Sequence, residues 1–207
     1  MLTVPNRREL SQPGKNEVRI LVLGPRNVGK TALTVRFLTK RFIGEYDSSQ
    51  ESTYTFETSI DNNKVSMEIL DATSPPEKLT EKVLWADGFL LVYSITDVNS
   101  FNEVVNLKHE IVAMRSNYRP AIFIVGNKSD LSCERCVPKD FALQIVQELN
   151  CPLYECSASE SYEDILQVFH ELYNEAIKKK KERRLSVSPR PLRKAFNKVF
   201  GGKTPPM

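Results

Sequence analysis

Hydrophobic and polar positions change their spacing repeatedly along the chain, and this spacing predicts the elements. Short apolar runs rich in branched and aromatic residues predict strands, and apolar residues three or four positions apart predict helices. The strand-like runs are residues 18–23, 54–60, 65–70, 89–93, 121–125 and 153–155. The helix-like segments are residues 30–40, 100–116, 138–149 and a long one from about residue 161. This alternation favours an α/β fold with a mostly parallel six-stranded sheet and helices on both faces.

Polar residues 61–63 separate the second and third strand-like runs, so these two strands are expected to form a hairpin. In a mostly parallel sheet, ligands bind beyond the carboxyl ends of the strands. The residues that directly follow each predicted strand are therefore the candidates for a binding site.

The residues after the first predicted strand fit the phosphate-binding pattern G-x-x-x-x-G-K-[ST]. Gly24 and Gly29 let the backbone approach a phosphate closely, and the N–H groups that start the following helix favour an anion. Lys30 is expected to reach the β- and γ-phosphates, and the Thr31 hydroxyl is expected to bind Mg²⁺. The residues expected around the phosphates are Gly24, Pro25, Arg26, Asn27, Val28, Gly29, Lys30, Thr31 and Ala32.

Two further motifs follow the third and the last predicted strands. Asp71 stands where an acidic residue can hold Mg²⁺ through water, although a helix cap or a surface turn is an equal alternative for an isolated aspartate. Ser157, Ala158 and Ser159 are small residues in a loop. A backbone N–H in such a loop can contact the O6 atom of guanine.

The tetrapeptide Asn127-Lys128-Ser129-Asp130 follows the fifth predicted strand and discriminates best between the bases. The Asp130 carboxylate can accept hydrogen bonds from both the N1–H and the 2-amino group of guanine. Adenine lacks both donors and would leave the carboxylate unpaired. Asn127 can connect neighbouring loops, and the aliphatic part of Lys128 can lie over the base. This motif predicts guanine specificity.

With these motifs in this order, residues 17–177 resemble the G domain of the Ras superfamily of small GTPases. Residues 37–44, 85–97 and 160–164 are similar to one branch of it, which contains Ras-like protein family member 11 and the Ras-related oestrogen-regulated growth inhibitor. The resemblance implies a P-loop NTPase fold that binds GTP or GDP with Mg²⁺.

The same resemblance implies further site residues. Phe42 would lie against the guanosine, and Ser49 would join Thr31 and Asp71 as a ligand of Mg²⁺. Residues 44–53 and 71–85 would contact effectors and regulators. The protein is expected to be a monomer.

The chain departs from the Ras pattern where the terminal phosphate would lie. Arg26 stands where Ras-type enzymes carry glycine, and Ser49 replaces a threonine. Ser74 replaces the glycine whose N–H senses the γ-phosphate, and Pro75 replaces the glutamine that orients the attacking water. Since proline has neither an amide side chain nor an N–H, no intact catalytic residue is expected and hydrolysis should be slow. Arg26 either acts in cis on the phosphate or, as we favour, obstructs the site.

Residues 178–207 form a basic tail with eleven Lys or Arg residues and one Glu. Because the whole chain has a net charge of +3, the remainder carries seven net negative charges. Ser186 follows two arginines, a pattern typical of basophilic kinase sites. A short basic amphipathic helix is expected, and it could bind polyanions (nucleic acid or anionic lipid) or import receptors. Its apolar residues are Leu192, Phe196, Val199 and Phe200.

Other features concern location. Residues 1–16 are polar and without periodicity, which predicts a flexible leader. No apolar run is long enough to span a membrane, and no signal region is visible. The four cysteines are unevenly placed and do not suggest a disulfide framework. Without a C-terminal cysteine box, no prenyl anchor is expected. We expect an intracellular protein, cytoplasmic or nuclear.

The sequence thus predicts a Ras-like GTPase, a guanine-nucleotide switch in signalling with weak GTP hydrolysis. Two alternatives stay open. One is a binding module that holds GTP without hydrolysing it and presents one fixed effector surface. The other is an adaptor whose basic tail binds nucleic acid or membrane, while the nucleotide only stabilises the fold.

Overall fold

The computed structural model describes residues 16–46, 50–60, 62–115 and 119–187 of the 207-residue chain. Its strands are β1 (Glu17–Leu23), β2 (Ser52–Ile60), β3 (Asn63–Asp71), β4 (Gly88–Ser94), β5 (Ala121–Asn127) and β6 (Leu153–Glu155). Its α-helices are α1 (Lys30–Thr39), α2 (Leu79–Trp85), α3 (Val98–Met114), α4 (Lys139–Glu148) and α5 (Tyr162–Val187). A short 3-10 helix, Ser132–Glu134, precedes α4.

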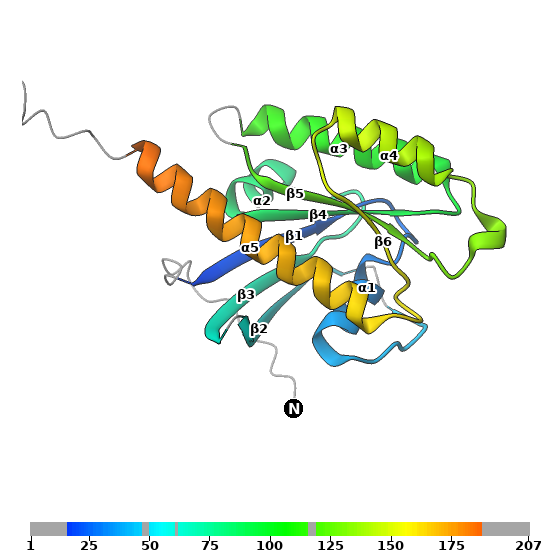
Figure 1. Cartoon of the computed structure of the whole chain (residues 1–207), viewed down its shortest axis with the longest axis horizontal. Helices are drawn as coiled ribbons and strands as arrows, with labels where there is room; N and C mark the ends of the chain where they lie inside the picture. Colours follow the sequence, from blue (N-terminus) through cyan, green and yellow to red (C-terminus); the bar gives the residue numbers. More distant parts are fainter. Residues whose placement is uncertain (1–15, 47–49, 61, 116–118, 188–207) are drawn as a thin grey trace, which may run out of the picture.

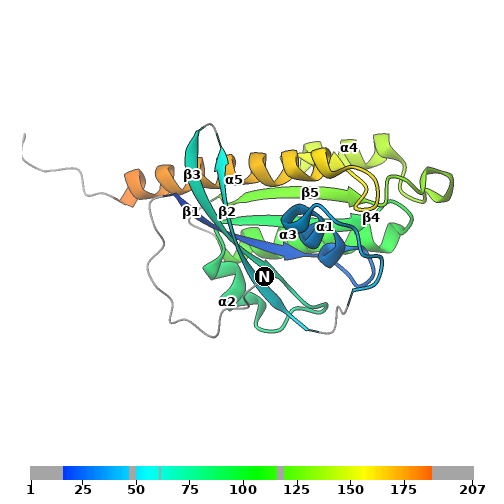
Figure 2. The same cartoon turned by 90° about the horizontal axis from the view of Figure 1, so that it is seen from below.

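The strands form one sheet in the order β2-β3-β1-β4-β5-β6. β2 pairs with β3 in antiparallel register, which confirms the expected hairpin, and the other pairings are parallel. Helix α5 runs across the sheet (Figure 1), and the edge view places α5 and α2 on opposite sides of it (Figure 2). The expected α/β fold with a mostly parallel six-stranded sheet is confirmed.

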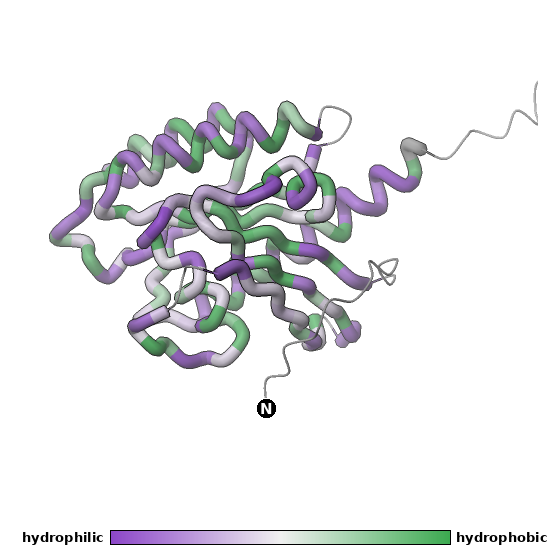
Figure 3. Tube along the Cα trace, turned by 180° about the vertical axis from the view of Figure 1, so that it is seen from behind, coloured by the Kyte–Doolittle hydropathy of each residue, from purple (hydrophilic) through white to green (hydrophobic). Residues whose placement is uncertain are grey.

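The core has two layers, one on each face of the sheet. Ile20 and Val22 of β1 pack in the layer under α1 and α5, where the rings of Phe37 and Phe169 stack with centroids 4.1 Å apart. Leu21 and Leu23 of β1 pack in the layer under α2, α3 and α4. Burial on both faces is why the central strands read as unbroken apolar runs. Figure 3 shows this hydrophobic interior and the hydrophilic end of α5.

Helix α2 is the element that the sequence analysis missed. It has only seven residues, its sole buried residue is Val83, and two prolines stand shortly before it. A helix of two turns shows too few repeats for a periodicity to be recognised. Tertiary contacts with β1 and α3 hold it in place, and such contacts override weak local signals.

Both ends of the described chain are tied to the sheet. The Tyr173 hydroxyl donates to the Asn16 carbonyl at 3.1 Å. Lys180 Nζ donates to the Glu17 carbonyl at 2.9 Å and to Asp87 Oδ2 at 2.8 Å. Asn16 and Lys180, which the sequence analysis assigned to the leader and the tail, therefore contact the folded domain. The rest of the expected leader, and the tail beyond Val187, lie outside the described residues.

Within the described part of the chain, no helix combines the length and the apolar character needed to cross a membrane. Helix α5 is long enough, but its second half is charged.

Candidate nucleotide-binding site

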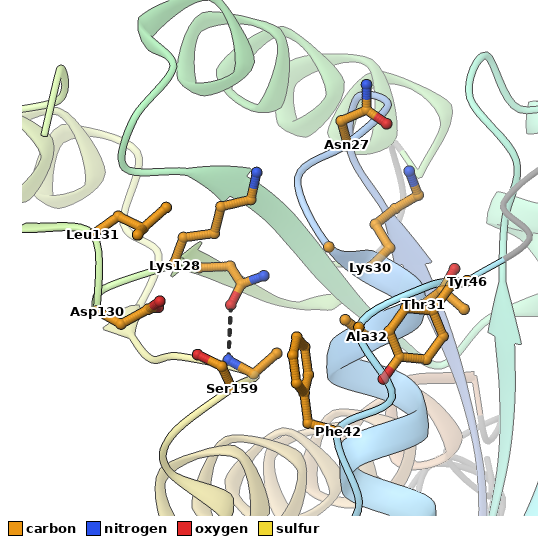
Figure 4. A pocket seen from close by; sticks show the side chains of 14 residues that line it. Asn27, Lys30, Thr31, Ala32, Phe42, Tyr46, Lys128, Asp130, Leu131 and Ser159 are labelled. Carbon is orange, nitrogen blue, oxygen red and sulfur yellow. Dashed lines mark hydrogen bonds between the residues drawn. The ribbon is translucent and has the colours of Figure 1, made fainter. Parts of the chain in front are cut away.

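A cavity of about 540 Å³ opens beyond the carboxyl ends of β1 and β5, a size usual for small-molecule sites. Figure 4 shows Lys30 and Thr31 on one side, Lys128 and Asp130 on the other, and Phe42 below the space between them. The lining residues are Asn27, Gly29, Lys30, Thr31, Ala32, Phe42, Gly44, Tyr46, Asn127, Lys128, Asp130, Leu131, Ala158 and Ser159.

The loop between β1 and α1 depends on its two glycines. Gly24 has a φ of 145°, and a Cβ atom there would lie 2.0 Å from the Val92 carbonyl oxygen. Gly29 has a φ of 92°, and a Cβ atom there would lie 2.2 Å from Nδ2 of Asn127. Both conformations strain any other residue, so glycine is needed at both positions. Because Gly29 has no side chain to cap α1, the N–H groups of the first helical turn stay available for an anion.

Lys30 starts α1 and is buried beneath this loop. Its Nζ donates to the carbonyls of Gly24 at 2.9 Å and Pro25 at 2.7 Å, and to the Ser74 hydroxyl at 2.7 Å. Burial lowers the pKa of the Lys30 ammonium, and the charge of Asp71 opposes this shift. The ammonium is thus fixed under the phosphate loop, where a bound phosphate would replace the solvation that burial removes.

Asp71 and Thr31 lie together at the end of β3. The Thr31 hydroxyl donates to Asp71 Oδ2 at 2.6 Å. Within the described chain, the buried Oδ1 atom of Asp71 has no hydrogen-bond partner. Burial raises the pKa of Asp71, while the Thr31 hydroxyl and Lys30 oppose this shift. A buried unpaired carboxylate oxygen beside a hydroxyl suits Mg²⁺, which prefers oxygen ligands. The third expected ligand, Ser49, lies outside the described residues.

Asn127 connects three loops of the site. Its buried side chain donates from Nδ2 to the Val28 carbonyl at 2.8 Å. Its Oδ1 accepts the Ala158 N–H at 3.2 Å, the contact dashed in Figure 4. The phosphate loop, the end of β5 and the loop after β6 are therefore held in one arrangement by a single amide.

Asp130 lies at the open end of the cavity and is exposed. No hydrogen bond from the described residues engages its carboxylate, so both oxygens can accept from a ligand. Lys128, with a positive φ of 65°, also lines the cavity, as does Leu131. Phe42 is 45% exposed and offers a ring face to a planar ligand. This part of the cavity has the acceptor and the apolar surfaces that a guanine base requires.

Several residues expected at the site do not line the cavity. Gly24, Pro25 and Val28 contribute carbonyl groups behind it, to Lys30 and Asn127. Ser157 is buried, and its hydroxyl lies 2.8 Å from the Ser159 hydroxyl and accepts the Glu160 N–H at 3.2 Å. Ser157 thus shapes the loop, while its neighbours Ala158 and Ser159 face the cavity.

Arg26 and Ser74, also expected at the site, bind each other beside Lys30. Nε of the exposed Arg26 donates to the Ser74 carbonyl at 2.7 Å. The Ser74 hydroxyl donates in turn to the Gly24 carbonyl. Pro75 follows and is exposed. The segment after β3 is thereby attached to the phosphate loop. The sequence analysis treated Arg26 and Ser74 separately and did not predict that they bind each other.

A model of the Ras family matches residues 19–178 of the chain. The chain belongs to the Ras family. It is 41% identical over 190 residues to the Ras-related and estrogen-regulated growth inhibitor of Homo sapiens, a match that covers 89% of this chain and 95% of that protein. It is 40% identical over 189 residues to Ras-like protein family member 11A of Mus musculus, covering 84% and 78%. With member 11B of Mus musculus the identity is 36% over 197 residues, covering 88% and 80%.

This Ras-family cavity also contains three residues that the sequence analysis did not assign: Gly44, Tyr46 and Leu131. The Tyr46 hydroxyl accepts the Ile43 N–H at 2.9 Å, and its ring lies 6.3 Å from that of Phe42. An aromatic pair four positions apart was a signal available in the sequence. Leu131 could also have been recognised in the sequence, because it is an apolar residue directly after a predicted base-binding motif.

Proposed function

We propose that this Ras-family protein binds GTP and GDP with Mg²⁺ and acts in signalling as a switch with slow GTP hydrolysis. One observation carries this proposal. The Asn127 amide holds the phosphate loop at Val28 and the loop at Ala158 in one frame, with Asp130 three residues further along the chain. The residues proposed to bind a base and those proposed to bind phosphates are thus held in a fixed arrangement. This arrangement suits a single ligand that has a base at one end and phosphates at the other.

Each part of the cavity would bind one part of the nucleotide. The Asp130 carboxylate would accept from N1–H and the 2-amino group of guanine, and Phe42 would lie against the guanosine. The N–H groups around Gly29 and the Lys30 ammonium would bind the phosphates. The Lys30 charge is already positioned beside the phosphate loop and partly desolvated, and it would exchange an internal contact for the phosphate on binding.

The oxygen ligands for a cation are also at hand. Thr31 and Asp71 would hold Mg²⁺, and Ser49 is the proposed third ligand. Bound Mg²⁺ would neutralise charge on the β- and γ-phosphates. The Thr31–Asp71 hydrogen bond already orients both groups toward each other.

Slow hydrolysis follows from the residues around the terminal phosphate. Pro75 has no group that could orient an attacking water. Arg26 is bound to the Ser74 carbonyl, so its guanidinium serves the loop and not a phosphate. This contact favours the obstructing role of Arg26 over an arginine that acts in cis.

The remaining proposals concern partners and location. Residues 44–53 and 71–85 are the proposed surface for effectors and regulators, and Leu84 on α2 exposes 59% of its side chain there. We further propose a monomer inside the cell whose tail binds polyanions or import receptors. Lys181 and Arg184 are exposed on α5 at the start of that tail.

Analysis of the nucleotide bound to the purified full-length protein tests the proposed function. A mixture of GDP and GTP that exchanges with free nucleotide is the expected result. GTP alone, retained without turnover, would instead support the module with one fixed effector surface. Protein that is purified without nucleotide would support the adaptor, and protein that binds none when it is added would contradict the proposal.

A further inference from the structure

The ammonium group of Lys30 uses all of its donors within the protein. A lysine ammonium has three N–H donors. In this structure they meet three acceptors, the carbonyl oxygens of Gly24 and Pro25 and the hydroxyl oxygen of Ser74. A phosphate that binds Lys30 must therefore replace one of these acceptors.

The three acceptors are not equally replaceable. Gly24 and Pro25 belong to the phosphate loop itself, and both precede Lys30 by only six and five residues. Ser74 is 44 residues away in the chain, in the segment between β3 and α2. It is half-buried and contributes a side chain, which can leave by rotation or by movement of its segment. Ser74 is thus the acceptor that a ligand can displace.

Two further contacts hold Ser74 in this position. Its hydroxyl proton is directed at the Gly24 carbonyl, which leaves the oxygen lone pairs for Lys30. Nε of Arg26 donates to the Ser74 carbonyl at 2.7 Å. Arg26 and Ser74 therefore act together. Arg26 fixes the backbone of Ser74, and the Ser74 hydroxyl accepts a hydrogen bond from Lys30.

The position of Ser74 determines which phosphate it meets. Asp130, Phe42 and Lys30 line the cavity in that order from its base end (Figure 4). Ser74 does not line the cavity, and its hydroxyl contacts the Lys30 ammonium at the phosphate end. With guanine at Asp130, the terminal phosphate of a triphosphate is the group furthest from the base. It is therefore the γ-phosphate that approaches the place of the Ser74 hydroxyl.

We infer that the Ser74 hydroxyl competes with the γ-phosphate for Lys30, and that Ser74 with Arg26 sets the preference of this protein for GDP over GTP. The inference rests on the proposed binding of guanine nucleotides. GDP lacks the γ-phosphate, and its β-phosphate lies nearer the base, where the N–H groups after Gly29 would receive it, so the Ser74 contact stays in place. GTP has to break this contact before its γ-phosphate reaches Lys30, and part of its binding free energy is used for that step.

The test compares the dissociation constants of GDP and a non-hydrolysable GTP analogue, in Mg²⁺, for full-length variants. Ser74→Ala is expected to raise the affinity for the GTP analogue relative to GDP by about 3- to 10-fold, the range for loss of one competing hydrogen bond. Ser74→Thr keeps the hydroxyl and is expected to keep the parental ratio. Thr73→Ala removes the neighbouring hydroxyl, whose one contact within the described residues is the Pro75 carbonyl at 3.5 Å, and serves as the matched control.

A double-mutant cycle with Arg26→Ala tests whether the two residues act together. The charge lost with Arg26 weakens phosphate binding in both arms of the cycle and cancels. If Arg26 holds Ser74 on Lys30, the gain from Ser74→Ala is smaller in the Arg26→Ala background than in the parent. Equal gains in both backgrounds would show that Arg26 plays no part.

The outcomes separate this inference from the proposed function. Parent protein that binds neither nucleotide would contradict the proposed function itself. Parent protein that binds both, with an unchanged ratio in Ser74→Ala, would overturn the role of Ser74 alone. A lower GTP-analogue affinity in Ser74→Ala would also overturn it, because the hydroxyl would then be a ligand of the phosphate.

Discussion

The two ends of the nucleotide cavity use their polar side chains in opposite ways. At the base end, Asn127 is committed to neighbouring loops, while the Asp130 carboxylate is left open to a ligand. At the phosphate end, Arg26, Lys30 and Ser74 bind one another and the phosphate loop. The base end is therefore ready for its ligand, whereas the phosphate end has to exchange internal contacts for contacts with a ligand.

This difference separates the residues proposed to bind the nucleotide from those proposed to slow its hydrolysis. The parts of the site that select a guanine and receive phosphates match the pattern of the family, and the cavity brings them together. Among the described residues, Arg26, Ser74 and Pro75 depart from the Ras pattern, and they lie in the phosphate loop and in the segment after β3.

The largest effect is expected from the base end. Asp130→Asn should weaken binding of GTP and GDP by roughly 10- to 100-fold, since one charge-assisted pair contributes about 1.5–3 kcal/mol. Xanthine nucleotides should bind better than in the parent, because their 2-oxo group accepts from the new amide. Titration with fluorescent nucleotides measures both effects.

Asp140→Asn is the matched control for this change, because Asp140 is exposed on α4 and does not line the cavity. Binding of GTP by Asp130→Asn at the affinity of the parent would show that the base is read elsewhere.

At the phosphate end, Pro75→Gln alone should restore little hydrolysis, because Arg26 and Ser74 still hold the segment on the phosphate loop. Pro75→Gln combined with Arg26→Gly should raise the rate by more than the product of the single effects, about tenfold or more, since groups that form one catalytic unit are non-additive. Single-turnover release of phosphate from preloaded GTP gives these rates, with and without an activating protein. Parental rates equal to those of ordinary Ras-type enzymes would reverse this assignment and restore Arg26 as a cis arginine.

Asp71→Asn should act in opposite directions on the free and the bound protein. Removing a buried charge with an unpaired oxygen should raise the unfolding free energy of the nucleotide-free protein by about 1 kcal/mol. Nucleotide affinity should lose most of its dependence on Mg²⁺, because a ligand of the cation is gone. Urea unfolding and nucleotide titrations with Mg²⁺ or with EDTA measure the two effects. An unaltered response to EDTA would exclude Asp71 from the metal site.

A change remote from both ends should affect neither selectively. Lys180→Met removes the bonds to Glu17 and Asp87 at the other end of the sheet and should lower the unfolding free energy by about 1 kcal/mol. The GTP and GDP affinities of the folded protein should stay equal to those of the parent. Lys181→Met, at the exposed next position, is the control and should change neither quantity. A shifted ratio of GTP to GDP affinity in Lys180→Met would show that the two ends of the sheet are coupled.

Most of the fold could be predicted because its central strands are buried on both faces and its longer helices repeat their apolar spacing several times. The base motif and the phosphate loop could be predicted for a different reason. Their residues are neighbours in sequence, and the chemistry of their ligands restricts both residue type and spacing.

The remaining contacts depend on segments that only the fold brings together. The contact of Ser74 with Lys30 joins positions 44 residues apart, and no sequence pattern in either segment predicts it. Lys180 is different, because it stands in a run of four lysines that reads as uniform tail. Its helical phase with Leu172 and Ala176, both buried, marks the side that faces the sheet, and this phase was available in the sequence.

Helix α5 also sets the distance between the nucleotide cavity and the point where the tail leaves the described domain. Its 26 residues span about 39 Å at 1.5 Å per residue. The helix starts beside the loop that carries Ser159 and passes Glu17, at the opposite end of β1 from Lys30. The length of the helix would therefore separate the nucleotide cavity from any surface that bound the chain beyond Val187.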